Sequence, residues 1–114
     1  MSTNNTISKS EFVVYGKGKN EEAINISNVF YISRPDKYVI FHMENNIFKH
    51  SGTLVEFEEI LPDNFFRIHR EYIVNMEYVA CIYKTYLKLV NGIEIPISRM
   101  HREQIQEFIT QHAR

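Results

Sequence analysis

Residues 61–75 decide the fold, and they read LPDNFFRIHREYIVN. Pro62 stops any helix that comes before it, because proline has no backbone N–H to donate and clashes with the preceding turn. Aromatic and β-branched residues then predominate in Phe65–His69 and in Tyr72–Asn75, which predicts two short strands. The connection between these strands carries Arg70, so the stretch combines strands with a local positive charge.

The residues before this stretch predict more strands. Gly16-Lys17-Gly18 is a turn signal, and Ser33-Arg34-Pro35-Asp36 has the composition of a loop. Glu44-Asn45-Asn46 separates a strong strand from a short partner, which indicates a hairpin. The expected strands are Glu11–Tyr15, the run from Ile24 through Ile32, Tyr38–Met43 and Ile47–Lys49.

Between these strands and residue 61, the spacing of the apolar residues becomes helical. Thr53 and Glu56 fit a capping box, in which the hydroxyl and the carboxylate each accept a hydrogen bond from a backbone N–H at the helix start. Leu54, Phe57 and Leu61 fall on one helical face. We therefore expect a helix of about two turns that ends before Pro62.

The residues after the central stretch predict strands at Val79–Tyr83, Tyr86–Val90 and Ile93–Ile97. Asn91-Gly92 lies between the last two strands. Both residues tolerate the positive φ angles of a type I′ turn, so we expect a tight hairpin there. Pro96 cannot donate to a strand ladder, which places its strand at the edge of a sheet.

A final helix is predicted after Ser98, whose side chain can cap the helix N-terminus. Ile105, Phe108 and Ile109 then form an apolar stripe at helical spacing. Residues 1–10 are mostly polar, and we interpret them as a flexible N-terminal arm. A chain of 114 residues accommodates one domain, which we place at residues 11–114.

The net charge of −1 argues mildly against a nucleic-acid partner, since DNA-binding domains are typically basic. The charges are unevenly distributed, however. Residues 66–70 and 98–102 are locally basic, whereas acidic residues gather at 21–22 and 56–63. The sequence therefore predicts that a basic face and an acidic face can form.

Composition disfavours several other classes of protein. Cys81 is the one cysteine, so no disulfide forms within the chain, which fits a reducing cytosol. No apolar run approaches the ~20 residues that a transmembrane helix needs. We expect a cytoplasmic protein that does not insert into membranes. The histidines and Cys81 show no zinc-ligand spacing, so neither a metal nor a cofactor is expected.

Catalysis is also disfavoured. A hydrolase with Cys81 as nucleophile and His69 as base can be written down. However, Cys81 lies in the middle of a predicted strand between Ala80 and Ile82, and we expect it to be an inert core thiol. No phosphate-binding loop or nucleophile elbow is present. The chain is therefore not expected to be an enzyme.

Three parts of the chain share their residues with one known family. The central stretch matches its pattern of Leu-Pro, then F-x-R-x-H, two residues, a hydrophobic pair and Val-Asn. Asn91-Gly92 and Ile95-Pro96-Ile97-Ser98-Arg99 match its closing pattern, and residues 34–39 resemble its "dkYv" loop. Over Glu11–Thr110 the chain resembles the LytTR family, the DNA-binding output domains of bacterial transcription regulators, response regulators among them.

This resemblance implies a mostly β fold of about ten short strands in small stacked antiparallel sheets, with one short internal helix and a C-terminal helix. It also implies sequence-specific binding to double-stranded DNA by loops and strand ends. The contacting positions fall on Lys37, Arg70 and Arg99; at the first two the family often has His, Asn or other polar residues. Family members typically act on two direct repeats, so a monomer in solution and two copies on one operator are expected.

The chemistry of these side chains agrees with DNA contact. The guanidinium fork of Arg70 or Arg99 can bond guanine O6 and N7 together in the major groove. Lys37 at a loop tip can reach a phosphate or a base. Ser98, at a helix N-terminus with free backbone N–H groups, is a candidate phosphate clamp.

Other basic residues are expected to support these contacts. Arg34 and Arg102 are candidates for contact with backbone phosphates. Arg67 and His69 share one face of a strand. We expect Arg67 to bond loop carbonyls and His69 to brace the loop that carries Arg70, with direct base contact by His69 as the alternative.

Each candidate residue can also be explained without any contact to DNA. Lys37 follows Pro35-Asp36 and can be an ordinary turn residue, and Arg70 can be an ordinary surface charge. Arg99 fits a solvated helix start, and Arg102 a solvated helix face. A second class of function therefore stays open, a β-sheet protein-interaction module that pairs through its edge strand. A free-standing regulator would also need control by its abundance or by an inhibitory protein partner.

Overall fold

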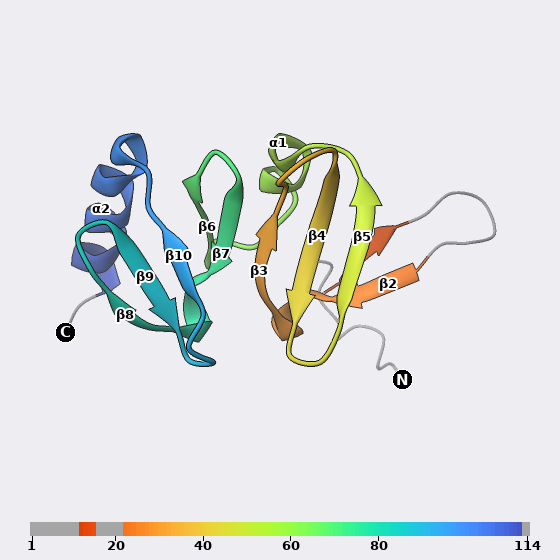
Figure 1. The fold of residues 1–114 in the computed structure, drawn as a ribbon, viewed down its shortest axis with the longest axis horizontal. Coiled ribbons are helices and arrows are strands. Elements are labelled where there is room, and N and C mark those ends of the chain that lie inside the picture. The colour runs from red at the N-terminus through yellow and green to blue at the C-terminus, as the bar shows by residue number, and fades with distance from the viewer. Residues whose placement is uncertain (1–11, 16–21, 113–114) are drawn as a thin grey trace.

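The computed structural model describes residues 12–15 and 22–112. Ten strands, two α-helices and three 3₁₀ helices lie within these residues, as Figure 1 shows for the strands and α-helices. The strands are β1 (Phe12–Tyr15), β2 (Glu22–Asn25), β3 (Val29–Ser33), β4 (Tyr38–Met43), β5 (Ile47–Ser51), β6 (Phe65–His69), β7 (Tyr72–Asn75), β8 (Val79–Ile82), β9 (Tyr86–Leu89) and β10 (Glu94–Pro96). The helices are η4 (Ile26–Asn28), α1 (Leu54–Glu58), η5 (Met76–Tyr78), η6 (Arg99–His101) and α2 (Arg102–His112).

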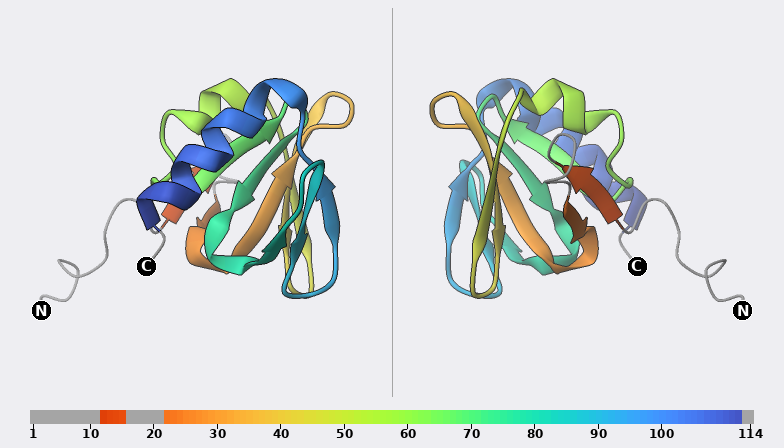
Figure 2. Two further views of the ribbon diagram at one scale, coloured as in Figure 1. Left: turned by 90° about the vertical axis from the view of Figure 1, so that its left-hand side faces the viewer. Right: turned by 90° about the vertical axis from the view of Figure 1, so that its right-hand side faces the viewer.

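A five-stranded antiparallel sheet in the order β5-β4-β3-β7-β6 forms the middle of the molecule. The three-stranded sheet β10-β9-β8 and helix α2 pack on one of its faces. Strand β2, which pairs with β1, and helix α1 pack on the other face. Figure 2 shows the molecule from the two sides that carry these layers. The expected mostly β fold with an internal and a C-terminal helix is confirmed.

An apolar core lies on each face of the central sheet, because side chains alternate along every strand. In β4, Val39 and Phe41 point into the first core. There the ring of Phe57 of α1 packs edge to face against the ring of Phe41, with 5.2 Å between the ring centroids. In β7, Val74 points into the second core with Leu87 of β9. The two cores explain how so many short strands bury enough apolar surface to be stable.

Helix α1 begins as the sequence predicts. The Thr53 hydroxyl accepts from the Glu56 N–H at 3.4 Å, and the Glu56 carboxylate accepts from the Thr53 N–H at 3.4 Å. Gly52, just before the cap, has a φ of +143°, and a Cβ there would lie 2.9 Å from Glu56 Oε1. Only glycine therefore fits before this capping box without strain.

The Val-Asn end of the central stretch has a structural explanation. Asn75 is fully buried, donates from Nδ2 to the Val29 carbonyl at 2.9 Å and accepts from Asn64 Nδ2 at 2.7 Å. Its Oδ1 also accepts from the Glu77 N–H and so caps η5. Asn25 caps η4 in the same way. One asparagine therefore joins β7 to β3 and to the segment before β6.

The β9–β10 hairpin is present, but its predicted type I′ turn is wrong. A type I′ turn needs a positive φ angle at both central residues. Gly92 has a φ of +93°, but no described residue other than glycine has a positive φ, so Asn91 does not meet this requirement. The Gly92 N–H donates to Leu89 O at 2.9 Å, and Asn91 Oδ1 accepts from the Ile93 N–H at 3.1 Å. The Leu89 N–H donates to Ile93 O at 2.8 Å, so the loop consists of Val90, Asn91 and Gly92. Among these three residues only Gly92 has a positive φ angle.

The prediction that Cys81 is a core thiol is also wrong, because Cys81 is exposed. It lies in β8, an outer strand of the three-stranded sheet. The pairing register of β8 with β9 shifts between Val79 and Cys81, which breaks the inward and outward alternation that the sequence pattern assumes. Strand β10 also lies at an edge of this sheet, as Pro96 predicts.

Candidate nucleic-acid interface

One edge of the central sheet collects the connections that carry the predicted site residues. Strands β3 and β6 both run antiparallel to β7, so they end at the same edge, and β5 ends there too because it is antiparallel to β4. The connections between β3 and β4, between β5 and α1, and between β6 and β7 therefore meet at the top of Figure 1, together with η6. We call residues 34–37, 52–53, 69–71 and 97–102 the loop edge.

Backbone hydrogen bonds join these connections to one another. The Arg34 N–H donates to the Glu71 carbonyl at 3.0 Å, and Arg34 Nε donates to the Gly52 carbonyl at 2.6 Å. The Ser98 N–H donates to the Ile68 carbonyl at 2.9 Å, which fixes the start of the η6 segment on β6. Segments far apart in the sequence therefore form one continuous surface.

The β6–β7 turn is held by the arginine of the F-x-R-x-H motif. Arg67 Nε donates to the His69 carbonyl and Nη2 donates to the Arg70 carbonyl, both at 2.8 Å. Its Nη1 forms an ion pair with Glu58 Oε2, also at 2.8 Å. His69 Nδ1 accepts from the Glu71 N–H at 3.1 Å. These bonds confirm the expected bracing by Arg67 and His69, and they leave the Arg70 side chain exposed on a fixed backbone.

The β3–β4 loop presents Lys37 differently. Pro35, Asp36 and Lys37 are all exposed, and the Lys37 ammonium lies 5.7 Å from the centroid of the Tyr38 ring. Arg34 is half-buried, and its Nε bond to Gly52 fixes the first residue of the loop only. Lys37 is therefore a cation on an exposed loop, in contact with an aromatic ring.

The η6 segment departs from the expectation for Ser98. Ser98 does occupy the N-cap position of η6, but its side chain makes no hydrogen bond to the helix backbone. Its Oγ lies 2.6 Å from His101 Nδ1 instead, so the predicted side-chain cap is wrong. Arg99 is exposed, whereas Arg102 is half-buried and its Nε has no hydrogen-bond partner among the described residues.

His101 is the last residue of η6, and it lies within electrostatic range of Arg67 and His69 of the β6–β7 turn. Burial lowers the pKa of His101, and the charges of Arg67 and His69 lower it further, while Glu58 opposes them. The ring is therefore neutral at pH 7, which suits its short contact with the Ser98 hydroxyl. The charges of Arg67 and Glu58, which hold the β6–β7 turn, therefore also act on the pKa of His101 in η6.

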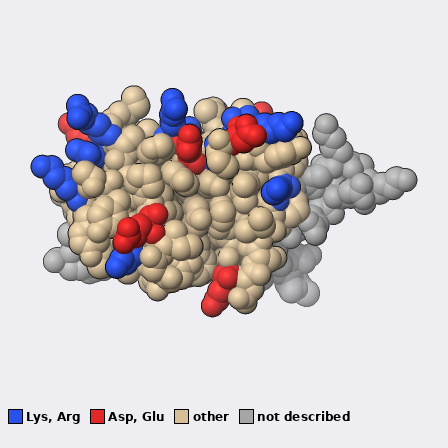
Figure 3. Space-filling model, in the orientation of Figure 1, with Lys and Arg blue, Asp and Glu red and all other residues tan. Residues whose placement is uncertain are grey.

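The predicted site residues come together at this edge. Figure 3 shows Lys and Arg side chains gathered along it, with some acidic side chains among them. None of Lys37, Arg70 and Arg99 forms an ion pair with a carboxylate of the described residues. All seven candidates lie within the loop edge: Arg34, Lys37, His69, Arg70, Ser98, Arg99 and Arg102. Their contact with DNA stays a prediction.

Lys49 was not among the predicted residues. Its ammonium lies 5.9 Å from the centroid of the Tyr38 ring, beside the β3–β4 loop. The one sequence signal was its position in an alternating strand, where it faces the same side as Tyr38. A lysine in a strand carries no motif, so only the pairing of β4 with β5 reveals its place.

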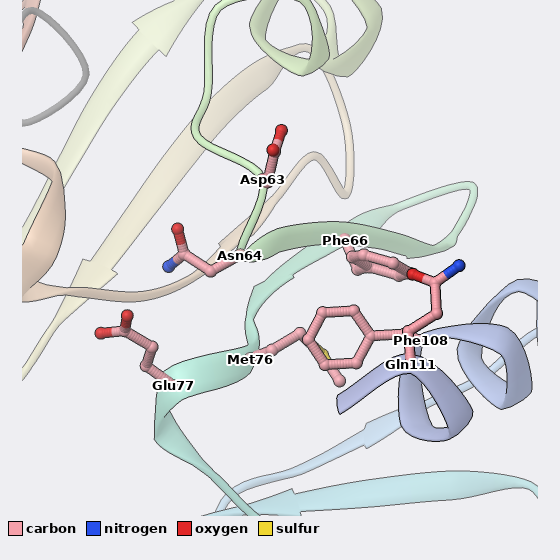
Figure 4. Close-up of a pocket in the computed structure, with 7 residues that line it drawn as sticks. All are labelled: Asp63, Asn64, Phe66, Met76, Glu77, Phe108 and Gln111. Carbon is pink, nitrogen blue, oxygen red and sulfur yellow. The ribbon is translucent and has the colours of Figure 1, made fainter. Parts of the chain in front are cut away.

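A cavity of about 660 Å³ lies on a different part of the surface, between β6, η5 and α2. Figure 4 shows Phe66, Met76 and Phe108 close together at one end of it. Two acidic residues, Asp63 and Glu77, also line the cavity. Because carboxylates repel phosphates, this surface does not suit DNA. It contains none of the seven predicted residues.

The described residues contain no group of three or more side chains that could hold a metal ion. No helix among them has both the length and the apolar character needed to cross a membrane.

Comparisons with known proteins agree with the sequence pattern and the fold. Residues 20–110 match the family described as LytTr DNA-binding domain. The sensory transduction protein LytT of Bacillus subtilis (strain 168) is 30% identical over 98 residues, which cover 81% of this chain and 41% of that protein. LytT of Bacillus anthracis is 27% identical over 92 residues, which cover 75% of this chain and 37% of that protein. The chain thus spans about two-fifths of the length of these curated relatives.

A solved structure shares the arrangement of strands and helices. The LytTr DNA-binding domain of a Bacillus cereus protein superposes with a TM-score of 0.76 at 28% sequence identity, over 87% of this chain and 96% of that one. The family match, the similarity to LytT and the shared fold all cover most of the chain, so it belongs to the LytTR family of DNA-binding domains.

Proposed function

We propose that this chain binds duplex DNA sequence-specifically as the output domain of a bacterial transcription regulator, with the loop edge facing the DNA. The observation that carries the proposal is the meeting of seven polar or cationic residues from three distant segments at one edge of a sheet. Hydrogen bonds within that edge support it, because a surface already ordered before binding loses less entropy when DNA docks.

The residues divide into three proposed roles: base reading, phosphate contact and positioning. Arg70 and Arg99 are exposed and forked, which suits reading guanine O6 and N7 in the major groove. Arg34 donates its Nε to Gly52, so its terminal nitrogens are left for a phosphate. The Ser98 hydroxyl contacts His101, so a phosphate clamp there would use the neighbouring backbone N–H groups. His69 acts as a positioning residue for Arg70.

The rigid edge also supports a proposal about DNA shape. A rigid row of loops cannot follow a straight groove at every point, so we expect the duplex to bend. A bend of about 40–90° over ~20–30 base pairs costs on the order of 1–6 kcal/mol. Phosphate contacts offset that cost. Two copies are proposed to bind direct repeats on one operator.

The experiment that tests the function is selection of bound sites from random duplex DNA, followed by affinity measurements at several salt concentrations. We expect one enriched sequence, with two direct repeats, and a steep loss of affinity as salt rises. Failure to enrich any sequence, with weak and salt-independent binding, would contradict the proposal. Gel mobility with the selected site moved along a fixed fragment tests the bend, because only a bent site changes mobility with its position.

The same salt series separates the alternative function. Strands β8 and β10 both lie at edges of the three-stranded sheet, and Ala80 and Cys81 of β8 are exposed. An interaction module that pairs through one of these strands would bind through main-chain hydrogen bonds. Its affinity for a partner would change little with salt, and duplex DNA would not compete.

A further inference from the structure

Two lysines, Lys37 of the β3–β4 loop and Lys49 of β5, lie against one exposed tyrosine at the outer end of the loop edge. Lys37 Nζ lies 5.7 Å from the centroid of the Tyr38 ring, and Lys49 Nζ lies 5.9 Å from the same centroid. Both distances are within the ~6 Å range of a cation–π contact. Tyr38 itself is 43% exposed, so this ring is not part of either core.

The strand register explains why these groups meet. Tyr38 pairs with Ser51 and Ile40 pairs with Lys49 in the β4–β5 ladder. Paired residues point to the same face of a sheet, so Lys49 and Tyr38 are diagonal neighbours on one face. Lys49 lies in β5, which is an outer strand of the five-stranded sheet. Its ammonium lies beside the ring of Tyr38, the residue that follows Lys37 in the sequence.

The charges of this cluster are not balanced by nearby carboxylates. Neither Lys37 nor Lys49 forms an ion pair with a described acidic residue. The nearest acidic residue in the sequence, Asp36, lines a cavity of about 290 Å³ together with Arg34 and Arg70. Two cations beside one exposed ring raise the local positive potential, and a bound anion lowers the energy of both. The arrangement therefore favours a bound anion.

We infer that Lys37, Lys49 and the Tyr38 hydroxyl bind one phosphate of the DNA backbone, which extends the interface from the loops onto β5. This inference rests on the proposed DNA-binding function. A phosphate is the fitting anion because lysine binds phosphate as a point charge and a tyrosine hydroxyl can donate to its oxygens. Lys49 lies within a strand and not at a loop tip, so it contacts the backbone and does not read bases.

The test compares Lys49→Gln with the wild-type chain on the selected site and on random duplex DNA over a range of salt. Loss of one whole phosphate contact reduces the slope of log K against log salt by ~0.9. Lys49→Gln leaves Lys37 on the shared phosphate, so the slope should fall by less than this amount. At 0.1 M salt the affinity should fall by less than about eightfold, equally on both DNAs. Lys88→Gln is the matched control. Lys88 lies in β9 of the other sheet, directly across from Glu94, and its replacement should leave the slope unchanged.

Further variants test the shared phosphate. Lys49→Arg keeps the charge and should restore the wild-type slope. Tyr38→Phe removes only the hydroxyl and should weaken binding to both DNAs by a smaller factor. In a Tyr38→Ala background, Lys49→Gln should cost less than it does alone, because the two groups serve one ligand. Thermal unfolding of each variant shows that the fold is intact.

The outcomes separate this inference from the function beneath it. If wild type binds DNA with a steep salt slope and Lys49→Gln keeps that slope, the phosphate site is wrong and the DNA-binding function stands. A loss confined to the selected site would show a base contact and would also overturn the inference. If wild type itself binds DNA without salt dependence, the proposed function fails first.

Discussion

The β6–β7 turn and the β3–β4 loop end at the same edge of the central sheet, yet they are held in different ways. Arg67 donates to the carbonyls of His69 and Arg70, and His69 accepts from the Glu71 N–H. In the β3–β4 loop, only Arg34 is fixed to its neighbours. The Lys37 ammonium contacts the exposed ring of Tyr38.

This difference indicates a division of work between the two connections. A guanidinium on a fixed backbone needs little ordering before it makes two directed hydrogen bonds, which suits base reading by Arg70. An ammonium on a flexible stem is a point charge that tolerates many geometries, which suits a phosphate contact by Lys37. If the comparison is correct, substitutions in the turn change specificity and substitutions in the loop change general affinity.

Arg67→Ala should have the largest effect, because two bonds to carbonyls and the ion pair with Glu58 are lost together. One hydrogen bond to a charged group contributes ~1.5–3 kcal/mol. We expect the free energy of unfolding to fall by at least about that amount in a urea titration. Affinity for the selected site should fall as well, since the backbone under Arg70 is no longer held.

Glu58→Gln is the control for this variant. It removes one partner of Arg67 and leaves both carbonyl bonds in place. Because this pair is partly exposed, the loss should be only ~0.2–1 kcal/mol. Equal stability of Arg67→Ala and wild type would show that the turn does not need Arg67, and the contrast with the β3–β4 loop would disappear.

Arg70→Ala and Arg99→Ala should come next in size. Each should cost ~1–3 kcal/mol of binding free energy on the selected site and much less on random DNA, because the guanidinium fork discriminates among bases. Measured affinities on both DNAs, at one salt concentration, check this. Equal losses on the two DNAs would assign both arginines to phosphates and not to bases.

Lys37→Gln should have a smaller effect of a different kind. The variant should bind the selected site and random DNA less tightly by the same factor, with a salt slope reduced by no more than the ~0.9 of one phosphate contact. The ratio of the two affinities, which measures specificity, should stay at its wild-type value. A change in that ratio would assign base reading to the β3–β4 loop as well.

The smallest expected effect concerns pH and the turn. The folded-state pKa of His101 lies below its ordinary value of 6.5 because of burial, Arg67 and His69. The unfolded chain therefore binds more protons between these two values. The stability that depends on a neutral His101 is complete above about pH 6.5 and is lost as the pH falls from that value through the lower folded-state pKa.

Urea titrations between about pH 5.5 and pH 8 check this expectation. Stability of His101→Asn should decline less steeply than that of wild type as the pH falls. His42 in β4 contacts Ser33 and Tyr31, and burial lowers its pKa as well. The stability of His42→Phe should therefore also fall less steeply than that of wild type as the pH decreases. An identical pH dependence in His101→Asn and wild type would remove His101 from the account.

Local patterns were sufficient for most of the secondary structure. Strands Tyr38–Met43, Phe65–His69 and Tyr72–Asn75 agree with their predicted bounds, and the capping box at Thr53 starts α1. These signals depend on residues within a few positions of one another, so a sequence contains them fully. The prediction of a type I′ turn was wrong because the turn type depends on the number of residues in the β9–β10 loop, which the pairing of the two strands sets.

The candidate site was predictable only in part. Arg70 and Arg99 were identified from a motif, and the bracing roles of Arg67 and His69 were also predicted. The expectation that Arg67 and His69 share one face of the strand is wrong, because the register of β6 with β7 shifts between them. Lys49 was missed, because a lone outward lysine in a strand is the ordinary case on a protein surface. Cys81 was placed in the core because a bulge in β8 is not visible in an apolar run.

The sequence by itself determined the elements, the family and the chemical character of Lys37, Arg70 and Arg99, since each of these is a property of residues and short spacings. Only the tertiary structure decided that they share one edge. The antiparallel order β5-β4-β3-β7-β6 brings the ends of β3, β5 and β6 together, and with them Lys37 and Arg70. The hydrogen bond from the Ser98 N–H to the Ile68 carbonyl adds the segment that carries Arg99. Strand order follows from packing of two cores across the whole chain, and no local pattern records which strands become neighbours.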